Sequence, residues 1–408
     1  MSAAATTTTK TKPLRVVIDC RLRSGVAGGI ESVILGLAGG LSRLSDGDEQ
    51  YVLLAYPNSH EWIAPLATGP CTMHLGTGVA AQTAAAPGDI SLPTSDGTIE
   101  DTLAADVMHF TVQRAFLTRV PSVYHPHDLQ HVHLPQFFDD AERRRRNVTY
   151  RTYCKQATMV AAAATWARDD FIKQFDLPEE KVHVVPLAPI LPEYAEPAAE
   201  DLATVHARYR LPEHFILYPA QTWRHKNHLR LIEALAILRE RHGLVVPLVA
   251  CGRQNEFFST IERRAIELGV RSQVHFLDFI PGFDVQCLYR LCRAVVIPTL
   301  FEAASGPLND AFLAGVPAAC SNVTALPRQA GDAALVFDPR EPAAIARAIR
   351  QLWTDEPLRQ TLITRGRARV AQFSWDRTAR HFRAHYRRIG GRPLTNEDRR
   401  FLSDEPLL

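Results

Sequence analysis

The sequence predicts an α/β protein built from two doubly wound parallel sheets, each covered by helices. Short apolar runs typical of buried strands alternate with helical stretches, and this alternation restarts once near the middle of the chain. A proline-rich stretch at 186–197 separates the two series and is the predicted linker. The length of 408 residues also exceeds one core, since a domain has about 150 residues. Because ligands bind beyond the carboxyl ends of parallel strands, the site is expected in the cleft between two facing domains.

Each predicted strand is a continuous apolar run, as expected of a strand buried on both faces. In the first series the strands are 14–20, 51–56, 106–110, 122–125, 157–164 and 182–187, and the helices are 30–44, 138–156 and 166–175. In the second series the strands are 215–220, 246–252, 274–279 and 294–300, with helices at 227–241, 256–269, 284–292 and after Pro307. Residues 65–102 are rich in Gly, Thr, Ala and Pro, and their pattern predicts neither helix nor strand.

The composition excludes several classes of protein. A net charge of +2 gives no strong overall field, so bulk attraction to nucleic acid is not expected. Seven scattered cysteines without a C-x-x-C pair indicate reduced, buried thiols in a cytosolic protein. No run reaches the roughly 18 apolar residues that span a bilayer. Residues 1–13 lack the apolar core of a secretory signal and are a predicted disordered tail.

A run of four arginines, 143–146, lies beside acidic residues in a predicted helix. We interpret it as a solvated helix face, with contact to anionic lipid as the alternative.

Two carboxylates flank the start of a predicted helix in the stretch "LFEAASGPLNDAFLAGVP", residues 300–317. Glu302 directly follows a buried strand and so lies at the ligand edge of the sheet, where a carboxylate can bind vicinal hydroxyls. Gly306 and Pro307 suit a helix start whose free amides favour an anion or hydroxyl groups. Asp310 has a second interpretation, because acidic residues in a first helical turn are favoured by the helix dipole.

This stretch, "EAASGPLNDA" at 302–311 followed by "GVP", resembles the E-x7-E motif "E-G-F-G-x-P-x-x-E-A" of retaining GT-B glycosyltransferases of family 4. The resemblance implies that Glu302 binds the donor sugar and that Asp310 binds the nucleotide ribose. The intervening donor-binding positions would be Ser305, Gly306, Pro307 and Leu308. Two departures are that Ser305 replaces a common Gly and that Asp310 is one methylene shorter than Glu.

Other segments extend the resemblance over nearly the whole chain. "FILYPAQTWRHKNHLRLIEALAIL", from residue 215, resembles the strand, phosphate loop and helix that open the second domain of the family, which implies that Lys226 binds the diphosphate. Arg224, in the same loop, is the candidate for a second positive charge, and a solvated side chain is the alternative. Many members carry an Arg six positions before this Lys, where Ala220 stands here, followed by Gln221. "SNVTALPRQAGDAALVFDP", from residue 321, also resembles the family.

The resemblance also covers the two ends of the predicted fold. In the first domain a glycine-rich loop offers Gly28 and Gly29 to the diphosphate and the acceptor. "FSWDRTARHFRAHYRRI", residues 373–389, resembles the last helix of the family, which crosses back onto the first domain.

The histidine-rich stretch "YHPHDLQHVHLP", residues 124–135, has two interpretations. Four histidines can suggest zinc, but their spacing and the lack of a cysteine do not favour a closed tetrahedral site. "HDLQHVHLPQFF" instead resembles the segment of the family whose His lies beside the transferred sugar, which makes His127 the catalytic candidate together with Glu302. Asp128 would orient the loop. Asp46-Gly-Asp48 reads as a surface turn, so no metal site is predicted.

The resemblance implies a GT-B fold of two Rossmann-like domains: 14–192 for the acceptor, 193–372 for the nucleotide-sugar donor, and 373–408 crossing back. It implies retaining transfer of a hexose, mannose- or rhamnose-type favoured, from a GDP- or UDP-sugar to a glycan or lipid-linked acceptor, without metal or other cofactor. Cell-surface polysaccharide synthesis in the cytoplasm, or at the inner face of the membrane, is the expected setting. The alternatives are an epimerase or phosphorylase of the same fold and a noncatalytic sugar-nucleotide-binding protein. Base, acceptor, linkage and oligomeric state stay open.

Overall fold

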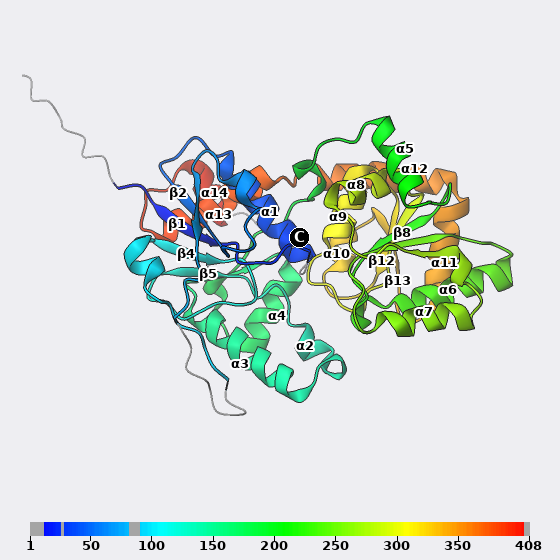
Figure 1. The fold of residues 1–408 in the computed structure, drawn as a ribbon, viewed down its shortest axis with the longest axis horizontal. Helices are drawn as coiled ribbons and strands as arrows, with labels where there is room; N and C mark the ends of the chain where they lie inside the picture. The colour runs from blue at the N-terminus through cyan, green and yellow to red at the C-terminus, as the bar shows by residue number, and fades with distance from the viewer. Residues whose placement is uncertain (1–11, 26–27, 81–89, 404–408) are drawn as a thin grey trace, which may run out of the picture.

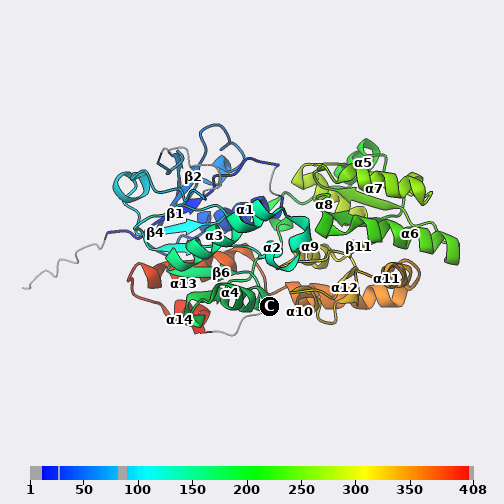
Figure 2. The ribbon, with the colours of Figure 1, turned by 90° about the horizontal axis from the view of Figure 1, so that it is seen from below.

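Two parallel sheets form the framework of the protein, and each lies in its own lobe (Figures 1 and 2). The computed structural model describes residues 12–25, 28–80 and 90–403. The first sheet has seven strands in the order β3-β2-β1-β4-β5-β6-β7, and the second has six in the order β10-β9-β8-β11-β12-β13. All paired strands of both sheets run parallel. The predicted fold class is thereby confirmed.

The first lobe follows the predicted series closely. Its strands are β1 (Arg15–Asp19), β2 (Gln50–Ala55), β3 (Cys71–Leu75), β4 (Val107–Phe110), β5 (Ser122–Tyr124), β6 (Met159–Ala162) and β7 (Val182–Val184). Its helices are α1 (Gly29–Ser42), α2 (Gln130–His133), α3 (Asp140–Gln156) and α4 (Thr165–Phe175). Strand β3 lies in the stretch that had no prediction. It is an edge strand in which only Cys71 is buried, so it lacks the continuous apolar run on which the prediction relied.

The second lobe is built in the same way. Its strands are β8 (Ile216–Pro219), β9 (Leu248–Cys251), β10 (Val274–Phe276), β11 (Ala294–Ile297), β12 (Ala318–Ser321) and β13 (Ala334–Phe337). Its helices are α5 (Ala199–Arg208), α6 (His228–His242), α7 (Phe258–Glu267), α8 (Gly282–Leu291), α9 (Gly306–Ala314), α10 (Leu326–Ala330), α11 (Pro342–Thr354) and α12 (Glu356–Val370). Helix α5 was not predicted, and it buries only Val205.

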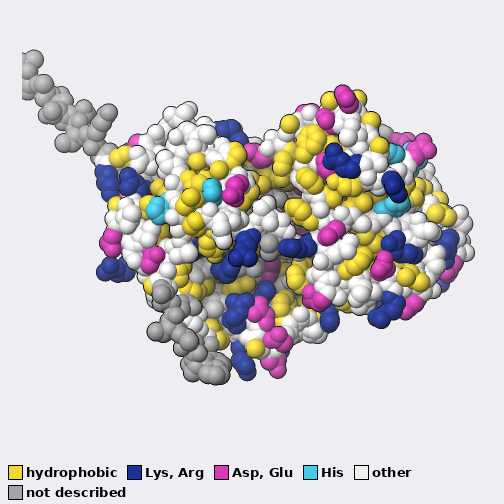
Figure 3. Space-filling view, in the orientation of Figure 1, with side chains coloured by type: hydrophobic (Ala, Val, Ile, Leu, Met, Phe, Trp, Pro, Cys, Tyr) yellow, Lys and Arg dark blue, Asp and Glu magenta, His cyan; other side chains and the backbone are white. Residues whose placement is uncertain are grey.

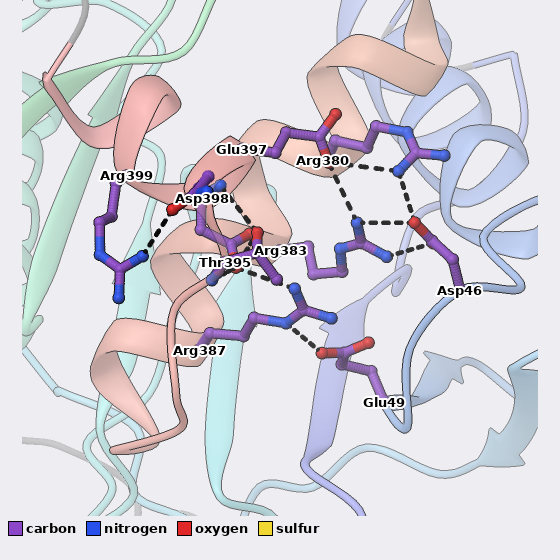
Figure 4. A network of polar contacts seen from close by, with 10 residues as sticks. Asp46, Glu49, Arg380, Arg383, Arg387, Thr395, Glu397, Asp398 and Arg399 are labelled. Carbon is purple, nitrogen blue, oxygen red and sulfur yellow. Dashed lines mark hydrogen bonds and ion pairs between the residues drawn. The ribbon is translucent and has the colours of Figure 1, made fainter.

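The last helices return to the first lobe (Figures 1 and 2), where α13 (Trp375–Ile389) packs on α1. The close packing depends on glycine, since a Cβ added at Gly36 would lie 1.9 Å from the ring of Trp375. Polar contacts fix the same helix (Figure 4): Arg383 and Arg380 bind Asp46, and Arg387 binds Glu49. The exposed carboxylate of Asp46 therefore binds arginines of helix α13.

Helix α14 (Asn396–Ser403) completes this network (Figure 4), because Arg387 also donates to Asp398 at 2.9 Å. This helix was not predicted. It is mostly polar and buries only Asp398 and Phe401, so few of its side chains mark it as part of the core. The predicted tail at 1–13 lies, apart from Lys12 and Pro13, outside the described residues.

The surface matches the modest net charge. Acidic and basic side chains are interspersed over both lobes in the view of Figure 3. In α3, Arg145 and Arg146 both donate to Glu142 at 2.7 Å, so helix carboxylates already pair with part of the basic run. All seven cysteines are free thiols. None of the helices in the described ranges is long and apolar enough to cross a membrane.

Candidate active site

The predicted site residues follow the strands at the centre of each sheet. In the first sheet β1 lies between β2 and β4, so the direction of winding reverses there, and Gly28 belongs to the loop after β1. In the second sheet the same reversal occurs between β8 and β11. Lys226 follows β8 and Glu302 follows β11. Ligands of open α/β sheets bind at such reversal points, because the loops on either side diverge and leave a crevice.

The loop that carries Lys226 is tied to the end of β11. His225 accepts hydrogen bonds through its backbone carbonyl from the amide of Leu300 at 2.7 Å and from the hydroxyl of Thr299 at 3.2 Å. Asn227, which has φ of 61°, donates from Nδ2 to the carbonyls of Pro298 and Pro339, both at 2.8 Å. The residues on either side of Lys226 therefore hold its backbone against β11, where Glu302 begins the next loop.

Lys226 and Glu302 form an ion pair. Lys226 donates from Nζ to Glu302 Oε2 at 2.7 Å. Their side chains are only 22% and 17% exposed, so water screens this pair less than it screens a surface pair. Glu302 is also held at its backbone, where its amide donates to the Thr324 hydroxyl at 3.1 Å. The two residues that the resemblance assigned to diphosphate and donor sugar are therefore in direct contact.

Helix α9 begins beside Glu302 and is fixed by buried polar groups. Ser305 is the N-cap and accepts a hydrogen bond from the amide of Leu308 at 3.4 Å. Gln329 donates to the Ser305 carbonyl at 2.7 Å and accepts from its amide at 2.9 Å. The side chains of Ser305 and Leu308 are buried and pack within the protein at the start of the helix. In contrast, no described atom lies within 4 Å of a Cβ built on Gly306. The open side of this helix start is thus at Gly306 and Pro307.

The position of Asp310 in helix α9 differs from the prediction. Helix α9 begins at Gly306, so Asp310 is its fifth residue, and the interpretation that placed it in the first turn is wrong. The carboxylate accepts from the amide of Ile190, in the linker, at 2.9 Å and is only 6% exposed. Burial raises the pKa of Asp310 to about 7, although the nearby amides of Ile190 and Leu191 act in the opposite direction.

His127 follows β5 in the first lobe and has a fixed orientation. Its Nε2 lies 2.7 Å from the carbonyl oxygen of Thr111. A carbonyl can only accept, so Nε2 carries the proton and the lone pair is left on Nδ1. Burial lowers the pKa of His127, which favours this neutral form. The backbone has φ of 62°, a strained value for a non-glycine residue of the kind found at functional sites.

The remaining histidines of this stretch have separate partners. His131 contacts Asn147 at 3.1 Å, and His133 contacts Asp170 at 2.9 Å. Across the described part of the chain, no group of three or more His, Cys, Asp or Glu side chains could hold a metal ion. Asp128 accepts from the amide of Gln130 at 2.9 Å and so orients the start of α2.

The loop around Glu302 packs on the first lobe. Phe301 and Ala303, the neighbours of Glu302, are buried in the apolar cluster that contains Leu129 and Leu134 of the His127 segment. The Phe301 ring lies 5.4 Å from the ring of His133. Contacts on both sides of Glu302 therefore bring the Glu302 loop against the segment that carries His127.

A second contact between the lobes lies at the glycine loop. Gln221 Nε2 lies 3.2 Å from the position of a Cβ built on Gly28, whose φ is 46°. A larger residue than glycine would therefore be strained and crowded here. No described atom lies within 4 Å of a Cβ built on Gly29, so that position is open.

Arg224, the other predicted diphosphate ligand, is exposed, and its guanidinium lies 5.3 Å from the centroid of the Phe257 ring. Its guanidinium thus lies against an aromatic ring, outside the ion pair of Lys226 and Glu302.

Sequence reasoning did not assign the residues that hold these side chains. Asn227, Thr324 and Gln329 position Lys226, Glu302 and the start of α9 through bonds to segments 20 or more residues away. Asn227 alone had a local signal, because asparagine tolerates the left-handed conformation it adopts.

Comparison with known proteins identifies the family that the second lobe matches. Residues 206–369 match the family described as "Glycosyl transferases group 1". The O-antigen chain mannosyltransferase B of Escherichia coli is 27% identical over 252 residues, which cover 61% of this chain and 66% of that protein. The serotype-specific mannosyltransferase WbdA of Escherichia coli is 31% identical over 229 residues, covering 55% of this chain and 28% of that protein. The matches thus span just under two thirds of the first relative and about a quarter of the second.

A solved structure shows the same overall arrangement. Anabaena Alr3699/HepE, in complex with UDP and glucose, superposes with a TM-score of 0.70 at 16% identity, covering 91% of this chain and 99% of that one. Similarity at this level of identity shows the fold alone, while the family match rests on the second lobe. The chain therefore has the GT-B fold, and its residues 206–369 match glycosyl transferases group 1, in agreement with the resemblance of its motifs.

Proposed function

We propose that the protein is a retaining glycosyltransferase that moves a hexose, mannose favoured, from a nucleoside-diphosphate sugar to a glycan or lipid-linked acceptor in cell-surface polysaccharide synthesis. The observation that carries this proposal is the 2.7 Å contact between Lys226 and Glu302 at the strand reversal of the second sheet. It places a cation suited to a diphosphate beside a carboxylate suited to sugar hydroxyls. The names of the two Escherichia coli relatives support mannose and a polysaccharide product.

In this proposal the residues act by position and charge. Lys226 neutralises the diphosphate as it leaves, and the amides at the open start of α9 add positive dipole. Glu302 orients the hexose through its hydroxyl groups, and His127 accepts a hydrogen bond from the sugar at Nδ1. The acceptor hydroxyl then attacks the anomeric carbon of the hexose on the face from which the diphosphate departs, and the diphosphate takes the proton of this hydroxyl. The anomeric configuration is thereby retained without a covalent nucleophile on the protein. The ribose contact that the resemblance implies for Asp310 is left out of this proposal, because the Ile190 amide of the linker already engages its Oδ1.

The direct test is incubation with a panel of GDP- and UDP-sugars, with release of the free diphosphate as the readout. We expect one donor to be consumed only when a saccharide acceptor is present. The anomeric configuration of the product linkage should match that of the donor. Interconversion of the free donor without acceptor would indicate an epimerase. Tight donor binding with no release under any condition would indicate a binding protein.

His127→Ala is expected to reduce turnover far more than donor affinity. The reason is that the proposed contact of His127 is to the reacting sugar, so its loss is felt mainly in the transition state. Matched controls are His131→Ala and His133→Ala, whose partners are Asn147 and Asp170. Steady-state kinetics on folded variants measures this, and equal losses in all three would point instead to a shared structural cluster.

Transfer is expected to survive EDTA. The basis is that Lys226 and the α9 amides already supply positive charge to the leaving diphosphate, a task that a divalent ion performs elsewhere. Turnover before and after chelation is the measurement. A complete loss that Mn²⁺ or Mg²⁺ restores would contradict a metal-independent mechanism.

A further inference from the structure

The linker between the lobes, residues 185–194, packs against both cores. Ala188 belongs to the apolar core of the first lobe, and Leu191 belongs to the core of the second. Ile190 is partly buried against both. A change in the angle between the lobes must therefore bend the linker close to Ile190, as it must bend the second crossing at Phe373, which also packs against both cores.

The first lobe holds the linker through α13 and α1. The Thr378 hydroxyl donates to the carbonyl of Pro186 at 2.9 Å, and the Trp375 indole donates to the carbonyl of Pro189 at 2.8 Å. Farther along, Glu193 accepts two bonds from the Arg43 guanidinium, both at 3.0 Å. These contacts hold the linker before Ile190, at Pro186 and Pro189, and after it, at Glu193.

The second lobe reaches the same point through Asp310. Its carboxylate accepts the amide of Ile190 at 2.9 Å and lies near the amide of Leu191. These amides belong to the N-cap and to the first residue of a short 3-10 helix, Leu191–Glu193, so the carboxylate caps its amino end from another part of the chain. Asp310 lies one turn into α9, whose open start at Gly306 is part of the proposed donor site.

We propose that Asp310 is a positioning residue that joins the donor helix α9 to the pivot of the interdomain linker, so that a nucleotide bound at the start of α9 steadies the angle between the lobes. This inference rests on the proposed function. It also explains the departure from the usual glutamate, because the side chain is 6% exposed and a longer one would push its carboxylate into the linker backbone.

The test combines amide hydrogen exchange, calorimetry and kinetics on Asp310→Ala, Asp310→Asn and Asp310→Glu. In Asp310→Ala we expect exchange at Ile190 and Leu191 to quicken at least tenfold and turnover at saturating donor to fall at least tenfold. The dissociation constant of the nucleoside diphosphate should change less than threefold. Asp310→Asn keeps a carbonyl oxygen for the Ile190 amide and should recover most of both losses, whereas Asp310→Glu should not.

Coupling has its own readout. In the wild-type protein, saturating nucleoside diphosphate should slow exchange at Ile190 and Leu191, and in Asp310→Ala it should not. The control is Asp332→Ala, which removes an exposed carboxylate of the same lobe that pairs with Arg365 at the surface. This control should behave as the wild type does in every measurement.

Two results would overturn the inference. One is that Asp310→Ala weakens the binding of both the free nucleoside and its diphosphate tenfold or more, while amide exchange in the linker stays unchanged. This is the outcome expected of a ribose ligand. The other is that linker exchange in Asp310→Ala matches the wild type, whatever happens to binding. If Asp310→Ala does not fold, the Asn and Glu variants decide the question, since equal exchange and turnover in the two contradicts the proposed fit. Exchange and binding need no transfer, so they stay informative even if the wild type proves to be no transferase.

Discussion

Glu302→Gln is expected to lower turnover at least about tenfold while the nucleoside diphosphate binds as tightly as before, or more tightly. The loss follows because one charge-assisted hydrogen bond to the donor sugar is worth roughly 1.5–3 kcal/mol, and about 1.4 kcal/mol is tenfold in rate. The gain in binding follows from the pair itself. Lys226 lies 2.7 Å from Glu302, so a neutral amide leaves the ammonium more available to the diphosphate.

Steady-state kinetics and calorimetry with the nucleoside diphosphate measure these two effects separately. The matched control is Glu341→Gln, which changes an exposed glutamate just before α11 and should alter neither quantity. Near-normal turnover in a well-folded Glu302→Gln protein would remove Glu302 from the site. A marked loss of diphosphate affinity would show that the ion pair supports the phosphate loop instead of competing with the ligand.

Lys226→Ala is expected to weaken nucleoside-diphosphate binding by roughly 10- to 150-fold, which corresponds to the loss of about 1.5–3 kcal/mol of charge-assisted bonding. Binding of the free nucleoside should barely change, because the contact proposed for the lysine is to the phosphates alone. The variant also leaves Glu302 as a partly buried carboxylate without its cation, which repels the diphosphate further. Calorimetry with both ligands is the measurement, and equal losses for both would contradict a phosphate contact.

Arg224→Ala tests whether a second cation replaces the arginine that this chain lacks before the phosphate loop. We expect a strong loss of diphosphate binding here too, with the nucleoside again as the control ligand. The guanidinium lies against Phe257, so it must leave this ring to reach the ligand. Diphosphate binding like that of the wild type would leave Lys226 as the only side-chain clamp, assisted by the α9 amides.

The interdomain contacts could not be predicted in the same way as the strands. Phe301 and Ala303 have the apolar character of any buried loop residue, and only the folded chain shows that they enter the core of the other lobe. Gln329 and Thr324 hold the Glu302 segment from 20 or more residues away, and nothing in their local sequence indicates this role. Strand β3 and helices α5 and α14 had no prediction, and each buries only one or two side chains. Strands β12 and β13 and the helices from α10 to α12 were not predicted either, although β12 is fully buried.

The sequence by itself predicted two parallel sheets, ten of their thirteen strands in order along the chain, and the two separate motifs that carry Lys226 and Glu302. These features depend on apolar runs and on loops that directly follow strands, and such signals are local. Tertiary structure alone decided that Lys226 and Glu302 pair across 76 residues, that α13 returns to the first lobe, and that Asp310 faces Ile190 across 120 residues. Local patterns specify which residues are buried but not which distant group they meet, because that depends on how whole elements pack.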